Sequence, residues 1–332
     1  MKADELKYSD IITIENLFQA WDEFKREKRN KKDVQQFERH LEDNLFELYT
    51  QLKKKTYRHG TYQEFYVTDP KRRHIHKSIV RDRVLHHLLY KYLYALFDKH
   101  FIHDSYSCRK DKGTHKSVKR LEKFARIVSK NYTRNCWSLK CDIKKFFASV
   151  DHSILKGLIA SKVKDEDINW LINNVIDSFN SEGCFGKGIP LGNLTSQIFS
   201  NIYLNELDQL VKHKLKEKYY LRYADDFLIL TADSKRHKDY LKTIRELLED
   251  NLKLELHPKK ISARKLTWGI DFCGYIVLPH YILPRTKTKR RILIKILQGS
   301  DYQALQAYLG YMSHSNGFRL SEKIKNEYWL NK

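Results

Sequence analysis

Two adjacent acids, Asp225 and Asp226, lie between the apolar stretches Lys218–Arg222 and Phe227–Thr231 in a segment with the sequence Tyr-Ala-Asp-Asp. This pattern predicts a hairpin with the acids at its tip. Neighbouring side chains of a strand point to opposite faces, but a turn can present at least one carboxylate to a cleft. Paired carboxylates can hold divalent metal beside a growing nucleic-acid end. Asp pairs are also ordinary turn residues that bond their own backbone, so a structural role is the alternative.

Another acid lies upstream, at the end of a predicted strand. Apolar and polar residues alternate over Trp137–Asp142, which predicts a half-buried strand whose polar face ends at Asp142. For Asp142 alone, a solvated strand end is the alternative to catalysis. The aromatic Phe147 follows five positions later. Asp151 precedes His152-Ser153, which favours an N-cap of a helix from Ser153 over a catalytic role.

The charge of the chain predicts a polyanionic partner. Its 332 residues include 63 Lys and Arg and 41 Asp and Glu, a formal net charge of +22, and the sequence pI is about 9.6. Basic groups that neutralise phosphates release counterions, which gives sequence-independent affinity for nucleic acid. Basic runs at Lys53–Lys55, Lys71–Arg73 and Arg285–Arg291 favour this over a merely soluble basic surface. The 21 tyrosines and 16 phenylalanines could stack on bases, although most should pack in the core.

Cysteine usage and hydropathy predict a cytoplasmic protein. The five cysteines form no Cys-x-x-Cys pair, which favours reduced thiols over zinc sites or disulfides. They are Cys108, Cys136, Cys141, Cys184 and Cys273. The N-terminus lacks an apolar signal region and no apolar run is long enough to span a bilayer, so no membrane partner is expected.

The first part of the chain is predicted to be helical. Apolar residues recur at helical spacing over Ile14–Phe24 and Phe37–Leu52, and the charged stretch Lys25–Asp33 separates these two helices. A strand is expected over Tyr62–Thr68, closed by Asp69-Pro70.

Further helices are expected over Arg83–Phe97 and, after the Gly-rich segment Gly183–Gly192, over Thr195–Lys218. The first contains His86 and His87. We expect these histidines to be packed or hydrogen-bonded, because no acid or cysteine lies at metal-ligand spacing.

The middle of the chain predicts a ferredoxin-like sheet. After the hairpin come a helix near Lys235–Asp250 and a short strand at Leu252–Leu256. The order strand, helix, hairpin, helix, strand is that of a ferredoxin-like domain, with acids arriving from non-adjacent segments. The basic stretch Pro284–Arg291 marks a boundary before a helical C-terminal piece.

Five motifs occur in the order that they have in the reverse transcriptases, and the chain resembles that family. They are Lys140–Phe147, Gly188–Gln197, Tyr223–Asp226, His257–Lys260 and Phe272–Tyr275. Five motifs in order make coincidence very improbable. The resemblance implies an α+β right-hand polymerase with fingers, a ferredoxin-like palm, and helical N-terminal and thumb regions. The implied domains are an N-terminal helical region at 1–60, fingers at 61–135 with part of 158–187, a palm at 136–284 and a thumb at 285–332.

Within that family, the chain is most similar to the bacterial enzymes of diversity-generating retroelements. Most reverse transcriptases have Gln before the second Gly of the turn motif and Ser-Pro after it, whereas this chain has Leu191 and Ser196-Gln197. Relatives commonly have a proline in the short stretch after the fingers arginine, here Arg73. His76–Ile79 contains none, so the backbone of the fingers is expected to differ there, whereas the chemistry is not affected. Further matches are Asp82–His87, Ser105–Lys110, Gly113–His115 and Tyr308–Gly310.

The resemblance implies a reaction with two Mg²⁺ ions about 3.5–4 Å apart, for which Mn²⁺ could substitute. Asp142 and Asp225 would bridge both ions, and the Ile143 carbonyl would add an oxygen ligand. Asp226 is the third acid, which would either coordinate the metal ions or adjust the electrostatic field around them. Hard Mg²⁺ prefers such oxygen ligands over nearby thiols. Lys260 matches a lysine proposed to protonate pyrophosphate as a general acid, with surface solvation as the alternative.

Other residues match positions that bind the incoming nucleotide. Lys71 and Arg73 match fingers residues that grip the triphosphate. Phe147 matches an aromatic residue that blocks a ribose 2′-hydroxyl, and core packing beside Phe146 is the alternative. The resemblance implies that the turn motif would contribute Leu191, Gly192 and Gln197 to the nucleotide site.

Two segments match positions that bind template and primer. Phe272, Cys273, Gly274 and Tyr275 resemble the primer grip, where Gly274 either permits close backbone approach or marks a bulge. Arg109 and Lys110 match contacts to the template backbone.

Leu191 carries a hypothesis about fidelity. A glutamine there could hydrogen-bond the incoming nucleotide, whereas leucine offers only shape and apolar contact. Such a bond contributes about 0.5–1.5 kcal/mol, and fidelity depends on differences of this size between right and wrong nucleotides. The resemblance implies easier misincorporation, particularly opposite template adenines. The alternative is that Leu191 is neutral.

The sequence therefore predicts an RNA-directed DNA polymerase that uses deoxynucleotide triphosphates to make error-bearing cDNA from the template RNA of a diversity-generating retroelement. The implied partners are that RNA, the cDNA and a small basic accessory helical-bundle protein. A polymerase of a retron, group II intron or phage-defence system is one alternative. A non-catalytic, RNA-binding, maturase-like module is another, disfavoured because all three acids are present. No nuclease motif, RNase H module or long maturase extension is evident.

Overall fold

Two units, each built from three separate stretches of chain, make up the protein in the computed structural model, which describes residues 5–69 and 71–331. The first unit contains the described residues up to Ile102, together with Ile143–Gln209 and Arg245–Glu255. The second contains His103–Asp142, Leu210–Ile244 and the described residues from Leu256 onward. The finer domain boundaries expected from the sequence stay a prediction. Residues 1–4 and 332, which belong to those predicted domains, and Pro70 lie outside the described residues.

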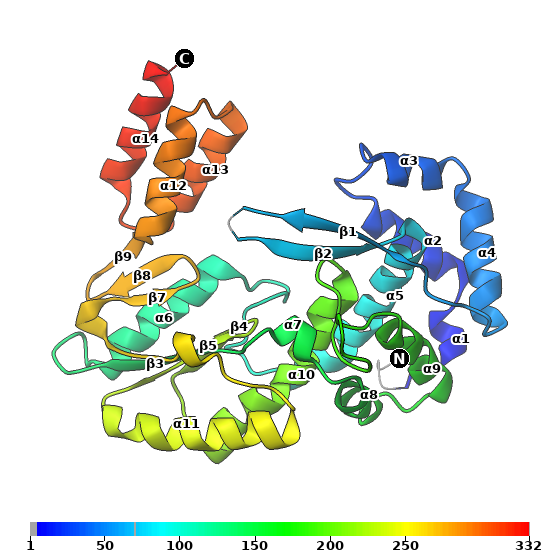
Figure 1. Ribbon diagram of the computed structural model, residues 1–332, viewed down its shortest axis with the longest axis horizontal. Helices are drawn as coiled ribbons and strands as arrows, with labels where there is room; N and C mark the ends of the chain where they lie inside the picture. The colour runs from blue at the N-terminus through cyan, green and yellow to red at the C-terminus, as the bar shows by residue number, and fades with distance from the viewer. Residues whose placement is uncertain (1–4, 70, 332) are drawn as a thin grey trace. The chain divides into compact units, whose positions relative to one another are not determined.

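The first unit is mainly helical and is organised around the buried helix α5 (Val80–Phe97). Helices α2 (Ile14–Phe24) and α10 (Leu194–Gln209) pack against it (Figure 1). Thr13 caps α2 by accepting a hydrogen bond of 3.2 Å from the Asn16 amide. The remaining helices of this unit are α1 (Tyr8–Ile11), α3 (Lys32–Glu38), α4 (Leu41–Lys53), the 3₁₀ turn η1 (Asp98–His100), α7 (Phe146–Ser149), α8 (His152–Ala160), α9 (Glu166–Asp177) and the π turn η4 (Leu247–Asn251).

Two helices differ from the sequence prediction: one is interrupted, and the other ends earlier than expected. The helix expected over Phe37–Leu52 is interrupted at His40, whose backbone is non-helical, and the Asn44 side chain donates to the freed Phe37 carbonyl at 3.0 Å. The helix expected to reach Lys218 ends at Gln209 and is followed by the π turn η2 (Leu210–Lys214). The N-cap prediction is confirmed: Asp151 accepts hydrogen bonds of 3.0 and 3.2 Å from two amides at the start of α8.

A β-hairpin projects from the helices of the first unit. Its strands β1 (Tyr62–Val67) and β2 (Arg73–Ser78) are antiparallel and pair over their whole length. The first of them confirms the predicted strand.

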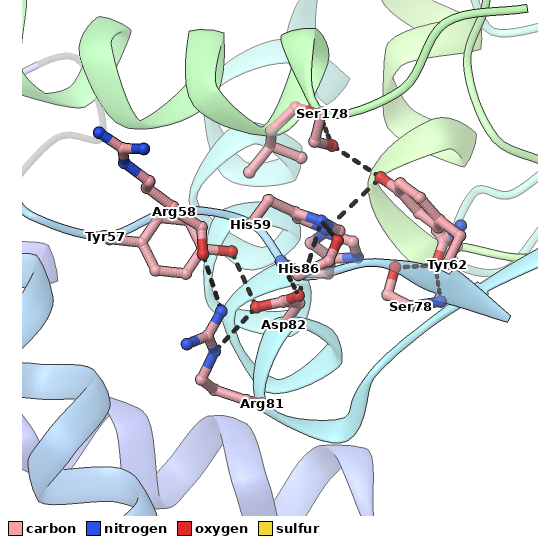
Figure 2. A network of polar contacts seen from close by, with 12 residues as sticks. Tyr57, Arg58, His59, Tyr62, Ser78, Arg81, Asp82, His86 and Ser178 are labelled. Carbon is pink, nitrogen blue, oxygen red and sulfur yellow. Dashed lines mark hydrogen bonds and ion pairs between the residues drawn. The ribbon is translucent and has the colours of Figure 1, made fainter.

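A buried polar network around Asp82 joins the segment before β1 to the start of α5 (Figure 2). The fully buried Asp82 carboxylate accepts hydrogen bonds from the Tyr57 hydroxyl (3.0 Å), the Gly60 amide (2.7 Å) and the Arg81 Nε (3.0 Å). Beside it, the Nε2 atoms of His59 and His86 are 3.2 Å apart. Burial holds the pKa of His86 well below its usual value, so this ring stays neutral.

The second unit contains a four-stranded antiparallel sheet in the order β4-β5-β3-β6. Helix α6 (Thr114–Val128) packs against β4 and β5, and Figure 1 shows α11 (His237–Glu246) on the opposite side of the sheet. The strand order and the antiparallel pairing are those of the predicted ferredoxin-like sheet. The strands are β3 (Trp137–Asp142), β4 (Tyr220–Tyr223), β5 (Asp226–Thr231) and β6 (Ser262–Lys265), and the short turns are η3 (Ser234–Arg236), η5 (Pro258–Lys260) and η6 (Leu266–Trp268).

The strand predicted at Leu252–Leu256 is wrong, because the edge strand of this sheet is β6. The three leucines of the segment are buried, which explains their alternation. Lys253, however, has a left-handed backbone (φ 51°), which breaks an extended strand.

The C-terminal part of the second unit joins a small sheet to three helices. The antiparallel strands are β7 (Ile270–Phe272), β8 (Tyr275–Leu278) and β9 (Tyr281–Pro284). The helices α12 (Thr286–Leu297), α13 (Tyr302–Met312) and α14 (Phe318–Leu330) pack around their own core and confirm the expected helical C-terminal piece. Among the helices of the described residues, none combines the length and the apolar character that a membrane crossing requires.

Candidate active site

The acid cluster is set by the register between β3 and β5. Asp142, the last residue of β3, lies directly opposite Asp226, the first residue of β5. Directly opposed residues of an antiparallel pair point to the same face of the sheet. Asp142 is only 8% exposed. The pairing therefore brings together two carboxylates that are far apart in the sequence.

Asp225 lies in the two-residue turn that joins β4 to β5. Tyr223 and Asp226 are the last cross-strand pair, and Ala224 has the left-handed backbone (φ 54°) that such a turn needs. The buried Arg222 side chain donates to the Ala224 carbonyl at 3.1 Å. Thr114 donates to the Tyr223 hydroxyl at 3.1 Å. These contacts fix the backbone of the turn.

Two lysines contact the acids. Lys260, in the turn after His257, donates to both oxygens of Asp142 at 2.8 and 2.9 Å. The backbone holds this turn beside β3, because the His257 amide donates to the Asp142 carbonyl at 2.8 Å. Lys140, two residues before Asp142 on the same strand face, lies 3.7 Å from Asp226. Lys260 is thus ion-paired rather than only solvated.

Burial and the neighbouring negative charges raise the pKa of two of the acids, Asp225 and Asp226. Burial, followed by the charge of Asp142, raises the pKa of Asp225 to about 6. Burial also raises the pKa of Asp226, with Lys140 opposing the shift and Asp142 adding to it. Burial alone would lower the pKa of Lys260, but its hydrogen bonds to Asp142 and the charges of the three acids raise it. A cation in this cluster would relieve the repulsion between the acids.

The cluster fits divalent metal by its donor chemistry. Its three carboxylates offer oxygen ligands of the kind that Mg²⁺ requires, and the Lys260 ammonium already occupies both oxygens of Asp142 as a cation would. Burial raises the pKa of the nearby Cys273 thiol to about 12, which keeps it protonated and a poor ligand. Ile143 follows Asp142 directly, and the use of its carbonyl as a ligand stays a prediction.

Metal binding by this cluster should therefore depend on pH. Asp225 holds its proton up to about pH 6, so Mg²⁺ must displace that proton in more acidic solution. We expect Mg²⁺ affinity to be maximal above pH 6 and to fall as the pH drops through 6, by at most roughly tenfold per unit for one proton. Calorimetric titration between about pH 5 and 8 measures this. An affinity that does not change over that range would contradict it.

The primer-grip residues form a second hairpin in the same unit as the acids. Cys273 and Gly274 make the turn between β7 and β8, with left-handed φ angles of 47° and 89°. The Tyr311 hydroxyl of α13 donates to the Gly274 carbonyl at 2.5 Å. A Cβ on Gly274 would lie 3.1 Å from that hydroxyl. Gly274 therefore lies in a two-residue turn and close to Tyr311, which replaces the alternative of a bulge, and its approach to a primer stays a prediction.

Arg109 and Lys110 follow a segment that is tied to β4. Ser105 and Arg222 form a parallel bridge, and the Tyr106 amide donates to the Arg222 carbonyl at 2.9 Å. Arg109 donates to the Ser105 carbonyl at 3.2 Å, and Lys110 is exposed. Their template contact stays a prediction.

The turn motif meets the β1–β2 hairpin inside the first unit. The Leu191 carbonyl accepts a hydrogen bond of 2.9 Å from the His76 amide. Gly192 (φ 107°) leaves no room for a side chain, since a Cβ there would lie 2.7 Å from Ile75. Gly192, Gln197 and Ile75 line one cavity of about 410 Å³.

The other predicted nucleotide contacts also belong to the first unit. Phe146 is buried and packs near Tyr203, whereas Phe147 is only partly buried. The Phe147 ring packs edge-on against Phe146 with centroids 5.3 Å apart, as the core-packing alternative expects, and its block of a 2′-hydroxyl stays a prediction. Lys71 and Arg73 are exposed around the start of β2. Their grip on a triphosphate stays a prediction.

The sequence interpretation missed Lys140 and Arg264. Both line a cavity of about 260 Å³ beside Asp226, together with Lys260. Lys140 also donates to the Asp271 carbonyl at 3.1 Å. The signal for Lys140 was available, because alternation along β3 puts it on the face of Asp142. Arg264 lies on β6, and the sequence interpretation missed it because it had put this edge strand at Leu252–Leu256.

A sequence profile described as "Reverse transcriptase (RNA-dependent DNA polymerase)" matches residues 53–277. This match covers the acid cluster, both lysines and the primer-grip hairpin. The chain belongs to the reverse transcriptase family. The predicted family is thus confirmed, whereas the retroelement subtype is not decided by the match.

Several relatives of this reverse transcriptase are intron-encoded proteins. It is 23% identical to Protein YkfC of Escherichia coli over 232 residues, which cover 59% of this chain and 60% of YkfC. It is 23% identical to the group II intron-encoded protein LtrA of Lactococcus lactis over 260 residues, 58% of this chain and 42% of LtrA. The putative COX1/OXI3 intron 2 protein of Saccharomyces cerevisiae is 24% identical over 212 residues, 46% of this chain and 25% of that protein. The matched region is thus at most about 60% of these relatives.

Solved structures confirm the right-hand polymerase fold. Apo telomerase from Candida tropicalis superimposes with a TM-score of 0.53 at 12% identity, covering 82% of this chain and 57% of the telomerase. Telomerase from the same yeast, in complex with a fragment of telomeric RNA, gives 0.52 at 13% identity, covering 85% and 56%. At these identities the likeness shows the fold alone.

Proposed function

We propose that the protein is an RNA-directed DNA polymerase that adds deoxynucleotides to a primer 3′ end. The observation that carries the proposal is the meeting of Asp142, Asp225 and Asp226 with Lys260 in a reverse transcriptase fold. The partners would be a template RNA, the cDNA and deoxynucleotide triphosphates.

The three acids would hold two Mg²⁺ ions. When bound, such ions supply activation of the primer hydroxyl and neutralisation of the leaving pyrophosphate. Residues of the chain would supply the proton for the pyrophosphate and hold the primer. Lys260, charged and ion-paired, carries a proton that it could donate to the pyrophosphate. The Cys273–Gly274 turn, fixed by Tyr311, would hold the primer terminus.

Primer extension on an RNA template tests the proposal. The wild type should extend a DNA primer, and Asp225→Asn should not. Asp239→Asn, which changes an exposed acid on α11 of the same unit, is the matched control and should extend like the wild type. Polymerisation that survives Asp225→Asn would refute the metal assignment. A wild type that only binds RNA would favour the non-catalytic, maturase-like alternative.

We propose further that the template RNA belongs to a diversity-generating retroelement and that the enzyme acts in the cytoplasm with a small basic accessory protein. Leu191 and the following Thr195-Ser196-Gln197 support this role, since they match that group. The second candidate is a polymerase of a group II intron, which the intron-encoded relatives favour. Sequencing the RNA that co-purifies with the protein separates the two.

Replacing Leu191 by glutamine should lower misincorporation opposite template adenines. The new amide could hydrogen-bond the incoming nucleotide, which is worth about 0.5–1.5 kcal/mol, or roughly two- to tenfold in discrimination. Sequencing the cDNA made by both proteins on adenine-rich RNA measures the change. Equal error spectra would show that Leu191 is neutral.

A further inference from the structure

The β1–β2 hairpin carries three metal-ligating side chains that the proposed polymerase reaction does not use: Glu64, His74 and His76. The two histidines alternate along β2 and therefore point to one face of the hairpin. Glu64 on β1 lies directly opposite His76 in the register and diagonal to His74, so it points to the same face. The pattern His-x-His with an acid on the neighbouring strand thus gathers three ligands at one place.

The ligand atoms lie close enough together to meet around one metal ion. The Nε2 of His74 lies 3.1 Å from one Glu64 oxygen, and the Nε2 of His76 lies 3.7 Å from the other. The ligand atoms all lie within 4.8 Å of one another. Zinc bonds of about 2.0–2.2 Å in a tetrahedron put neighbouring ligand atoms about 3.3–3.6 Å apart. We propose that Glu64, His74 and His76 bind Zn²⁺ or a similar divalent transition metal, with a fourth position open to solvent.

Aromatic neighbours hold both imidazoles in place. The Tyr66 ring stacks on His74 with centroids 4.5 Å apart, and Phe179 lies edge-on to His76 at 4.7 Å. Rings that are held before the metal arrives lose less conformational freedom on binding, which increases affinity.

The ligand set also separates this site from the acid cluster. Two imidazole nitrogens suit zinc and other borderline metals, whereas Mg²⁺ prefers oxygen ligands alone. Millimolar Mg²⁺ should therefore not displace zinc from the hairpin. Because its ligands come from both strands, a bound ion would cross-link β1 to β2 near the segment that carries Lys71 and Arg73.

Zinc titration of untagged, chelator-stripped protein in excess Mg²⁺ tests the proposal. The wild type should bind one more equivalent of Zn²⁺ than either His74→Gln or His76→Gln. Loss of a direct ligand should weaken binding by more than the roughly 10–100-fold that loss of an outer-shell partner costs. Glu64→Gln, which keeps the size but removes the charge, should also weaken it. His40→Gln, an exposed histidine in the same unit, is the matched control and should bind like the wild type.

Two further readouts keep the result independent of folding and of polymerase activity. Zinc should raise the melting temperature of the wild type but not of the histidine variants, and all should melt alike in EDTA. Asp225→Asn should keep the hairpin site. Co²⁺ should give a visible absorption band typical of low coordination number in the wild type and in Asp225→Asn, but not in the two histidine variants. Equal zinc binding in the wild type and both histidine variants, or no saturable binding in the wild type, would overturn the proposal.

Discussion

Replacing Asp142 by asparagine should reduce primer extension by about a thousandfold or more, a loss of about 4 kcal/mol in transition-state stabilisation. The carboxylate has two functions that asparagine cannot replace. It faces Asp226 across the sheet, where it would offer a negatively charged oxygen to the proposed metal ions, and it holds Lys260 through both of its oxygens. A neutral amide offers one weak oxygen ligand and would release the lysine.

The same substitution should leave the fold intact. Asp142 contributes repulsion to the cluster, since its charge helps to raise the pKa of Asp225. Removing that charge should therefore keep or increase the melting temperature and lower the pKa of Asp225 toward its usual value. Extension on an RNA template, melting curves and a pH titration measure these effects. An activity within tenfold of the wild type would contradict the role given to Asp142, whereas Asp239→Asn should change neither property.

Replacing Asp82 by alanine should lower the free energy of unfolding by about 3–5 kcal/mol, the usual cost of breaking a buried charged network. The change would leave the Tyr57 hydroxyl, the Gly60 amide and the Arg81 guanidinium without their acceptor (Figure 2). Asp82 is fully buried, so water cannot replace the lost bonds without opening the packing around it.

Denaturant unfolding of the variant measures this loss. Asp82→Asn, which keeps an acceptor oxygen, should lose less than Asp82→Ala. The matched control is Asp22→Ala, because Asp22 forms a surface ion pair with Lys25 and its side chain is 61% exposed. Such pairs contribute at most about 1 kcal/mol. A loss at Asp82 no larger than at Asp22 would show that the network does not stabilise the first unit.

Local patterns in the sequence were enough for elements whose signals lie within a few residues. Alternation gave the bounds of β3, and apolar spacing gave α2. The Asp151 cap could be predicted because capping depends only on the next two or three amides. Periodicity failed at Leu252–Leu256, where burial alternates without strand pairing, because a buried loop and a strand produce the same apolar pattern.

The sequence by itself thus determined the family and the residue types of the active site, since motif order and short-range spacing are properties of the chain. Only the tertiary structure decided that Asp226 faces Asp142, because that depends on the register of strands from separate segments. The contact between Lys260 and Asp142, 118 residues apart, likewise depends on where the backbone returns to β3. The Glu64, His74 and His76 cluster became visible in the same way, because cross-strand pairing decides which side chains share a face.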